Sequence, residues 1–243
     1  MKKASVYLLL FSIFTLAIAS CKKSSDNGGS GYKCTTCTST PEGVAANDNS
    51  SKGIYKGVVI GSTGTIEFNI MNNGTTLTAT MVIDGQTANL TSNITWAAGQ
   101  PVIAPFTGTL NGASVTITFS VGSTGVEPTV ISSNIPGHPN ATFLIAKETS
   151  TVLIKCFEGK YHTTRPEDGT FNVILSEQLH AFAVVSSENG SNSSDYAEGT
   201  LTSDGKIKDD SGNVIGTLSG DEMSGSFKDS NGYTITFNGK RTK

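Results

Sequence analysis

Apolar and polar residues alternate along several short segments between residue 53 and the end of the chain. In each segment every second position is apolar, and the positions between are mostly Thr, Ser or Asn. This period of two is typical of antiparallel strands with one buried face and one solvated face. The clearest examples are residues 66–70, 77–83, 115–121 and 233–237. No segment has a convincing helical period, so the sequence predicts an all-β fold.

Short turns rich in Gly, Asn and Asp separate these segments. Glycine and asparagine tolerate the positive backbone angle φ that tight hairpins require. The turns lie at residues 72–74, 84–85, 111–112, 204–205, 211–212 and 231–232. The acidic turn at 209–213 does not match a calcium-binding EF-hand loop, whose acidic positions alternate. The order of strands and turns predicts antiparallel meanders that form small sandwich or barrel-like domains.

A weak internal repeat divides the β region. Residues 55–57 are Tyr-Lys-Gly and are followed by the Gly-Thr strand 64–70, while residues 157–159 are Phe-Glu-Gly and are followed by the Gly-Thr strand 169–174. The two copies are about 100 residues apart, which is a common domain size. We therefore predict two β domains, with a single continuous sheet or barrel as the alternative. Their predicted bounds are residues 53–148 and 152–243.

The first 21 residues have a different pattern. Lys2 and Lys3 precede an apolar run from Val6 to Ala19, which is shorter than the roughly 20 residues that span a bilayer. Such a run is typical of a cleaved signal peptide. Its last residues, Ile-Ala-Ser followed by Cys21, resemble the lipobox of bacterial lipoproteins. The resemblance implies removal of residues 1–20 and attachment of diacylglycerol and fatty acyl chains such as palmitate to Cys21.

The residues after Cys21 indicate which membrane would hold the lipidated protein. Lys22 and Lys23 follow Cys21, so the Asp that commonly retains Gram-negative lipoproteins at the inner membrane is missing, and the opening resembles Bacteroidetes-type outer-membrane lipoproteins. The resemblance implies the outer membrane, facing either the periplasm or the cell surface. The segment 21–52 is rich in Ser, Gly, Asn and Asp, so we predict a lipidated, disordered tether. Such a chain would reach roughly 30 Å.

The net charge of the chain argues against a nucleic-acid partner. The full chain has 17 Lys and Arg residues against 20 Asp and Glu residues. Removing residues 1–20 removes two lysines, which leaves 15 basic against 20 acidic residues and a net charge of about −5. Nucleic-acid binding requires a basic footprint, so the sequence predicts no nucleic-acid partner.

Three cysteines remain after Cys21. Cys34 and Cys37 form a CxxC motif, whereas Cys156 lies in an apolar run. A thioredoxin-like site would need a βαβ context, haem attachment would need His in place of Thr38, and zinc would need a second ligand pair. A local Cys34–Cys37 disulfide in an oxidising envelope is the favoured interpretation, and redox, metal and Cys156-paired alternatives stay open. Cys156 would then be a buried free thiol.

Three residues are candidates for ligand contact. Trp96 is the only Trp, and with Tyr161 it could stack on a glycan, although a lone Trp is more often part of a core. His162 precedes Arg165 and the carboxylates at 167–168, the only place where a base, a cation and acids lie close in sequence. General acid–base chemistry would need these groups to converge on one cleft. A polar hairpin end is the simpler interpretation.

No motif for nucleophilic, zinc-dependent or nucleotide chemistry is present. We therefore predict no enzyme, catalytic residue, cofactor or metal, with a hydrolase as the less favoured alternative, because glycosidases need only two carboxylates from distant positions. The predicted function is a lipid-anchored envelope protein that acts as a non-catalytic binding or structural module. Its expected partners are the membrane, through the anchor, and a glycan or envelope protein. Surface capture of a glycan or nutrient is the alternative.

Overall fold

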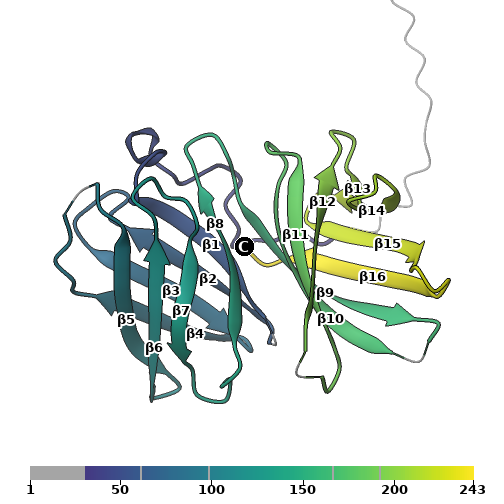
Figure 1. The fold of residues 1–243 in the computed structure, drawn as a ribbon, viewed down its shortest axis with the longest axis horizontal. Helices are drawn as coiled ribbons and strands as arrows, with labels where there is room; N and C mark the ends of the chain where they lie inside the picture. Colours follow the sequence, from purple (N-terminus) through teal and green to yellow (C-terminus); the bar gives the residue numbers. More distant parts are fainter. Residues whose placement is uncertain (1–30, 61, 98, 166, 192) are drawn as a thin grey trace, which may run out of the picture. The chain divides into compact units, whose positions relative to one another are not determined.

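The computed structural model describes residues 31–243 except positions 61, 98, 166 and 192, and these residues form one compact unit with two lobes (Figure 1). The signal peptide and Cys21 predicted from the sequence lie outside the described residues. Strands dominate, and the described part contains one short 3-10 helix, Ala45–Asn47, and no α-helix. The all-β prediction is confirmed, as is the expectation of antiparallel meanders.

The first lobe is one eight-stranded antiparallel sheet in the order β7-β6-β5-β4-β3-β2-β1-β8. The sheet curls on itself, but β7 and β8 are not hydrogen-bonded neighbours. Its strands are β1 (Gly53–Ile60), β2 (Gly64–Ile70), β3 (Leu77–Ile83), β4 (Gln86–Ser92), β5 (Val102–Leu110), β6 (Ala113–Val121), β7 (Thr129–Asn134) and β8 (Thr142–Glu148).

Aromatic side chains fill the core of the first lobe. The rings of Phe68 and Phe119 stack with their centroids 4.4 Å apart, and Tyr55 and Phe106 pack against this pair at 5.1 Å. All four side chains are fully buried. The alternation seen in the sequence explains this core, because the alternating apolar residues of β2, β3 and β6 point inward. Val82 of β3 lies between two of these positions, so it faces outward and is exposed.

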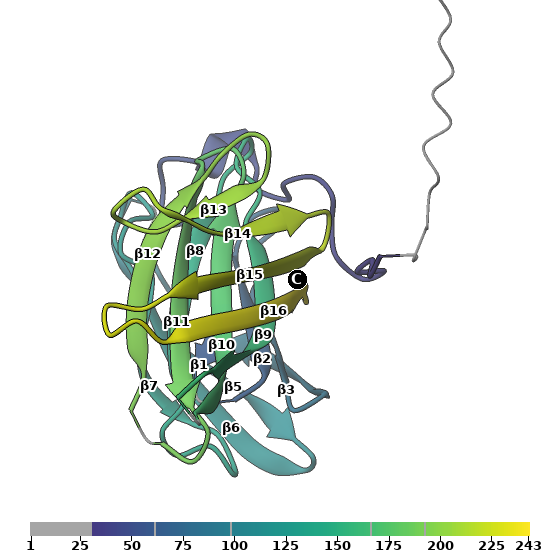
Figure 2. The same cartoon turned by 90° about the vertical axis from the view of Figure 1, so that its right-hand side faces the viewer.

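The second lobe is a closed eight-stranded barrel. Each strand pairs with its neighbour in sequence, and the last strand, β16, pairs with the first, β9. Figure 2 shows β15 and β16 crossing in front of β10 and β11, which form the opposite wall. Its strands are β9 (Lys155–Thr163), β10 (Asp168–Ser176), β11 (Ala181–Glu188), β12 (Asp195–Leu201), β13 (Lys206–Lys208), β14 (Val214–Ser219), β15 (Glu222–Lys228) and β16 (Thr234–Arg241).

The two lobes share one topology, which the internal repeat indicated. In each lobe the last strand pairs with the first, and the repeated segments lie on the equivalent strands β1–β2 and β9–β10. Gly57 faces Ile66 in the first pair, and Gly159 faces Phe171 in the second. The lobes differ mainly in closure, since only β9–β16 form a complete hydrogen-bonded ring.

The outer faces of β9 and β10 pack against the first lobe. Val58, Ile154, Cys156 and Ile174 form a buried apolar cluster there. The amide of Asn172 donates a hydrogen bond to the carbonyl oxygen of Val59 at 2.8 Å. Cys156 is a buried free thiol, as the sequence predicted, and burial raises its pKa to about 12.

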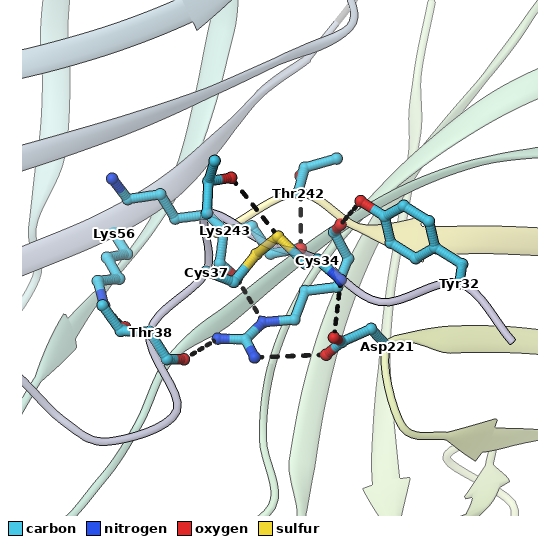
Figure 3. Close-up of a disulfide and its surroundings, with 11 residues drawn as sticks. Tyr32, Cys34, Cys37, Thr38, Lys56, Asp221, Thr242 and Lys243 are labelled. Atoms are coloured by element: carbon cyan, nitrogen blue, oxygen red, sulfur yellow. Dashed lines mark hydrogen bonds and ion pairs between the residues drawn. A yellow bond between two sulfur atoms is a disulfide. The ribbon is translucent and has the colours of Figure 1, made fainter. Parts of the chain in front are cut away.

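Residues 31–52, here called the arm, differ from the tether that the sequence predicted. Cys34 and Cys37 form the expected local disulfide (Figure 3). Around it, the Tyr32 hydroxyl donates to the carbonyl oxygen of Arg241 at 2.8 Å, and the Cys34 amide donates to the Asp221 carboxylate at 2.9 Å. The polar composition indicated a segment unable to fold alone, but these polar groups bind an existing surface. Ordered structure therefore begins well before the first strand.

A buried ion pair joins the arm to the first lobe. Lys56 is 1% exposed, and its ammonium lies 2.9 Å from a carboxylate oxygen of Glu148 and 2.9 Å from one of Glu42. Glu148 also accepts hydrogen bonds from the backbone amides of Glu42 and Ile154. Burial by itself lowers the pKa of Lys56, but hydrogen bonds and charge from Glu148 and Glu42 outweigh that effect and raise it.

Candidate functional site

The interior of the second lobe holds a cavity of about 400 Å³. Its wall is mostly apolar because alternate residues of β9–β16 point into the barrel. Inward-facing side chains that contribute to the wall include Phe171, Phe182, Val184, Ile215, Phe227 and Phe237. Most of these side chains are only partly buried, although they lie inside a closed barrel. The lumen is therefore accessible from outside the barrel.

Glycines in the wall explain why the aromatic rings leave space. A Cβ atom at Gly199 would lie 2.7 Å from the Phe182 ring, and one at Gly216 would lie 2.6 Å from the Phe237 ring. The rings therefore lie against glycines of nearby strands, a known device for covering glycine in a sheet. In the first lobe, by contrast, the rings stack on one another in the centre. Aromatic side chains thus fill the core of the first lobe, whereas in the second lobe they line the cavity.

One end of the barrel is open and acidic. Because the strands run up and down, the loops β9–β10, β11–β12, β13–β14 and β15–β16 gather at the same end, which we call the mouth. The cavity reaches residues of three of these loops, the exception being β11–β12, and residues of the flanking strands, including Asp195 at the start of β12. The charged residues among them are Arg165, Glu167, Asp195, Asp209 and Asp229, and Glu198 of β12 also lines the cavity. Toward the other end, Leu201 and Met223 are buried.

The acidic side chains are held in place by local bonds. The guanidinium of Arg165 lies 2.6 Å from the Glu167 carboxylate. Asp209 accepts hydrogen bonds from the backbone and side-chain amides of Asn213, which lower its pKa. Asp229 likewise accepts a bond from the backbone amide of Tyr233. The turn geometry therefore fixes two carboxylates at the mouth.

The pKa of Tyr161 reflects the partly buried and acidic surroundings of the cavity. Its side chain lines the cavity, and burial raises its pKa, with further increases from the charges of Glu188 and Glu167. A neighbouring negative charge disfavours the phenolate. The phenol is thus neutral at ordinary pH and can serve as a hydrogen-bond donor or acceptor beside an apolar wall.

The three candidate contact residues from the sequence do not form one site. Trp96 lies after β4, where it packs against the core of the first lobe and donates from Nε1 to the carbonyl oxygen of Gln100 at 2.9 Å. Tyr161 lines the cavity. His162, the next residue of β9, is exposed and pairs with Asp168 in a polar hairpin end.

A second hollow, of about 540 Å³, lies beside His162. Tyr161 also borders it, together with polar residues of β9, β10 and β16 such as Lys160 and Asn238. It lacks the apolar wall of the barrel cavity. We therefore take the barrel cavity as the candidate functional site.

Within residues 31–243, where the structure describes them, no three His, Cys, Asp or Glu side chains are grouped to hold a metal ion. In the same part of the chain, no helix is long and apolar enough to cross a membrane. Comparison of the chain with protein-family models, with curated proteins and with solved structures finds no match.

Proposed function

We propose that this chain is a lipid-anchored envelope protein whose second lobe binds a small apolar or amphiphilic ligand without converting it. The observation that carries the proposal is the cavity of about 400 Å³ inside a closed barrel. Ligand sites are typically concave, mostly apolar and roughly 300–1,000 Å³ in volume. An eight-stranded barrel has an interior just wide enough to hold one small ligand.

The separation of apolar and charged residues within the cavity supports the binding of such a ligand. The inner wall is apolar, and the charged groups are confined to the mouth and to Glu198. An apolar ligand part would enter the barrel with favourable free energy of about 25 cal/mol per Å² removed from water. Polar groups at the mouth would orient whatever part of the ligand stays in water.

The anchor proposed from the sequence fits this function. Ligands with large apolar parts partition into membranes, so a receptor held at the membrane meets them where they are concentrated. The polar hollow beside His162 is a less favoured place for a ligand such as a glycan, because few aromatic faces surround it.

The test uses the chain without its signal and anchor, residues 22–243, which includes the whole compact unit. Titration with N-phenyl-1-naphthylamine, a neutral probe that fluoresces in apolar surroundings, should saturate. Ala197 lines the cavity from β12, whereas Thr200 of the same strand does not line it. Ala197→Phe should weaken binding at least about tenfold by filling the cavity, and Thr200→Phe should bind like the parent chain. Equal binding by both variants would refute the cavity as the site.

A further inference from the structure

The mouth of the barrel has a strong excess of negative charge. Four carboxylates line the cavity at the mouth, from Glu167, Asp195, Asp209 and Asp229. Among the described lining residues, Arg165 is the single cation, and Glu167 already pairs with it. One guanidinium against four carboxylates leaves a net charge of about −3 at the mouth at neutral pH. A mouth lined by one sign of charge concentrates ions of the opposite sign.

Aromatic rings occur beside these carboxylates. Tyr233 follows Asp229 in the β15–β16 loop, and Phe227 near the end of β15 lies two residues before Asp229. Tyr161 lines the cavity from β9. The faces of aromatic rings attract cations, and organic ammonium groups are recognised in this way. The mouth therefore combines two features that favour a cationic group.

An anionic head group would meet the opposite situation. It would approach the carboxylates of Asp195, Asp209 and Asp229 and would find no described cation lining the cavity that lacks an acidic partner. Bringing like charges together costs free energy, and the cost grows as water is excluded. A neutral apolar ligand would gain only from the inner wall.

We propose that the ligand is a cationic amphiphile, with an alkyl or similar apolar part inside the barrel and an amine or quaternary ammonium group among the carboxylates at the mouth. This inference rests on the proposed function, because it requires that the cavity binds the apolar part. The cavity supplies the binding and the charges select the head group.

The test compares three probes with the same ten-carbon chain and different heads: decyltrimethylammonium, decanol and decanoate. Each is titrated by calorimetry into residues 22–243, below its micelle concentration and at low ionic strength. Decyltrimethylammonium should bind about tenfold more tightly than decanol, and decanoate should bind most weakly. Raising the salt concentration should shrink the advantage of the cation, since exposed charges are screened.

Two pairs of substitutions locate the effect. Asp195→Asn with Asp229→Asn should reduce the preference for the cation several-fold and change decanol affinity far less, because both carboxylates lie at the mouth and the inner wall is unaltered. Glu177→Gln with Asp204→Asn changes the net charge equally at the opposite end of the barrel, in the loops β10–β11 and β12–β13. This control pair should keep the preference.

The outcomes separate the two proposals. If none of the three probes binds, the proposed function itself fails. If decanol binds as tightly as the cation, or decanoate binds best, the function stands and the inferred ligand class is overturned. If both pairs of substitutions reduce the preference equally, the mouth does not select the head group, and the inference is likewise overturned.

Discussion

Lys56 shows how a single residue can change its role once the chain folds. In the sequence it is a polar residue in a strand of apolar neighbours, and nothing nearby suggests a partner. In the structure its ammonium is enclosed by Glu148, 92 positions later, and by Glu42 of the arm. A buried charge is tolerated when it is paired and hydrogen-bonded. The ion pairs therefore hold the arm to β1 and β8, which are the first and last strands of the first lobe and neighbours in its sheet.

Replacing Lys56 tests this role. Lys56→Met should lower the free energy of unfolding by about 3–5 kcal/mol, because the buried Glu148 carboxylate loses its counter-charge. The measurement is urea unfolding followed by fluorescence. Lys155→Met is the matched control, since Lys155 pairs with the exposed Glu177, and it should cost less than about 1 kcal/mol. Equal effects of the two substitutions would contradict a structural role for the buried pair.

At the scale of elements, β9 and β10 of the second lobe each use their two faces differently. Inward-facing residues of β9 and β10, such as Tyr161, Phe171 and Val173, line the cavity. Outward-facing residues of the same strands, such as Cys156 and Ile174, pack on the first lobe. The period of two separates these functions, so each face can be altered without changing the other.

Glycine in β15 tests the packing of the barrel wall. A Cβ atom at Gly225 would overlap the Phe237 ring and the Ile215 carbonyl oxygen of the neighbouring strand. Gly225→Ala should therefore destabilise the protein by about 1–3 kcal/mol, measured as a shift of the urea midpoint. Gly74 lies in a turn with open space around it, so Gly74→Ala should change stability by less than about 1 kcal/mol. An unchanged midpoint for Gly225→Ala would show that the ring is not held against this strand.

At the scale of the whole molecule, the two lobes share a topology but differ in what they enclose. The first is filled by fully buried aromatic rings, and the second retains a cavity. The arm touches both, through Glu42 at the first lobe and through Cys34 and Tyr32 at the second. We infer that the filled lobe and the arm serve as a rigid support for the binding lobe.

The proposed anchor is tested on the whole protein in cells. Cys21→Ser should release the chain from the membrane fraction, because the acyl chains contribute about 0.8 kcal/mol per buried methylene. Ser25→Thr, near the acceptor residue but outside the lipobox, is a control for altered expression. Retention of the Cys21→Ser protein in membranes would contradict lipid anchoring. For the anchored parent protein, protease digestion of intact cells would show which side of the outer membrane the lobes face.

The candidate site was only partly predictable. Tyr161 was singled out from the sequence and does line the cavity, whereas Trp96 belongs to the other lobe and His162 points away. The carboxylate at 209 was noted only as part of an acidic turn, and the one at 229 was not singled out. Their convergence depends on every second loop meeting at one end of a closed barrel, which no local pattern reveals.

The sequence by itself determined the all-β class, the antiparallel meanders and the clearest alternating strands, because alternation and turn chemistry act over a few residues. It also predicted the Cys34–Cys37 disulfide and the buried thiol of Cys156, for the same local reason. The tertiary structure decided that the second meander closes while the first stays open between β7 and β8. It decided that the arm is ordered and that Lys56 is paired. It also decided where aromatic rings fill a core and where, lying against glycines, they leave a cavity, because ring positions depend on contacts between strands distant in sequence.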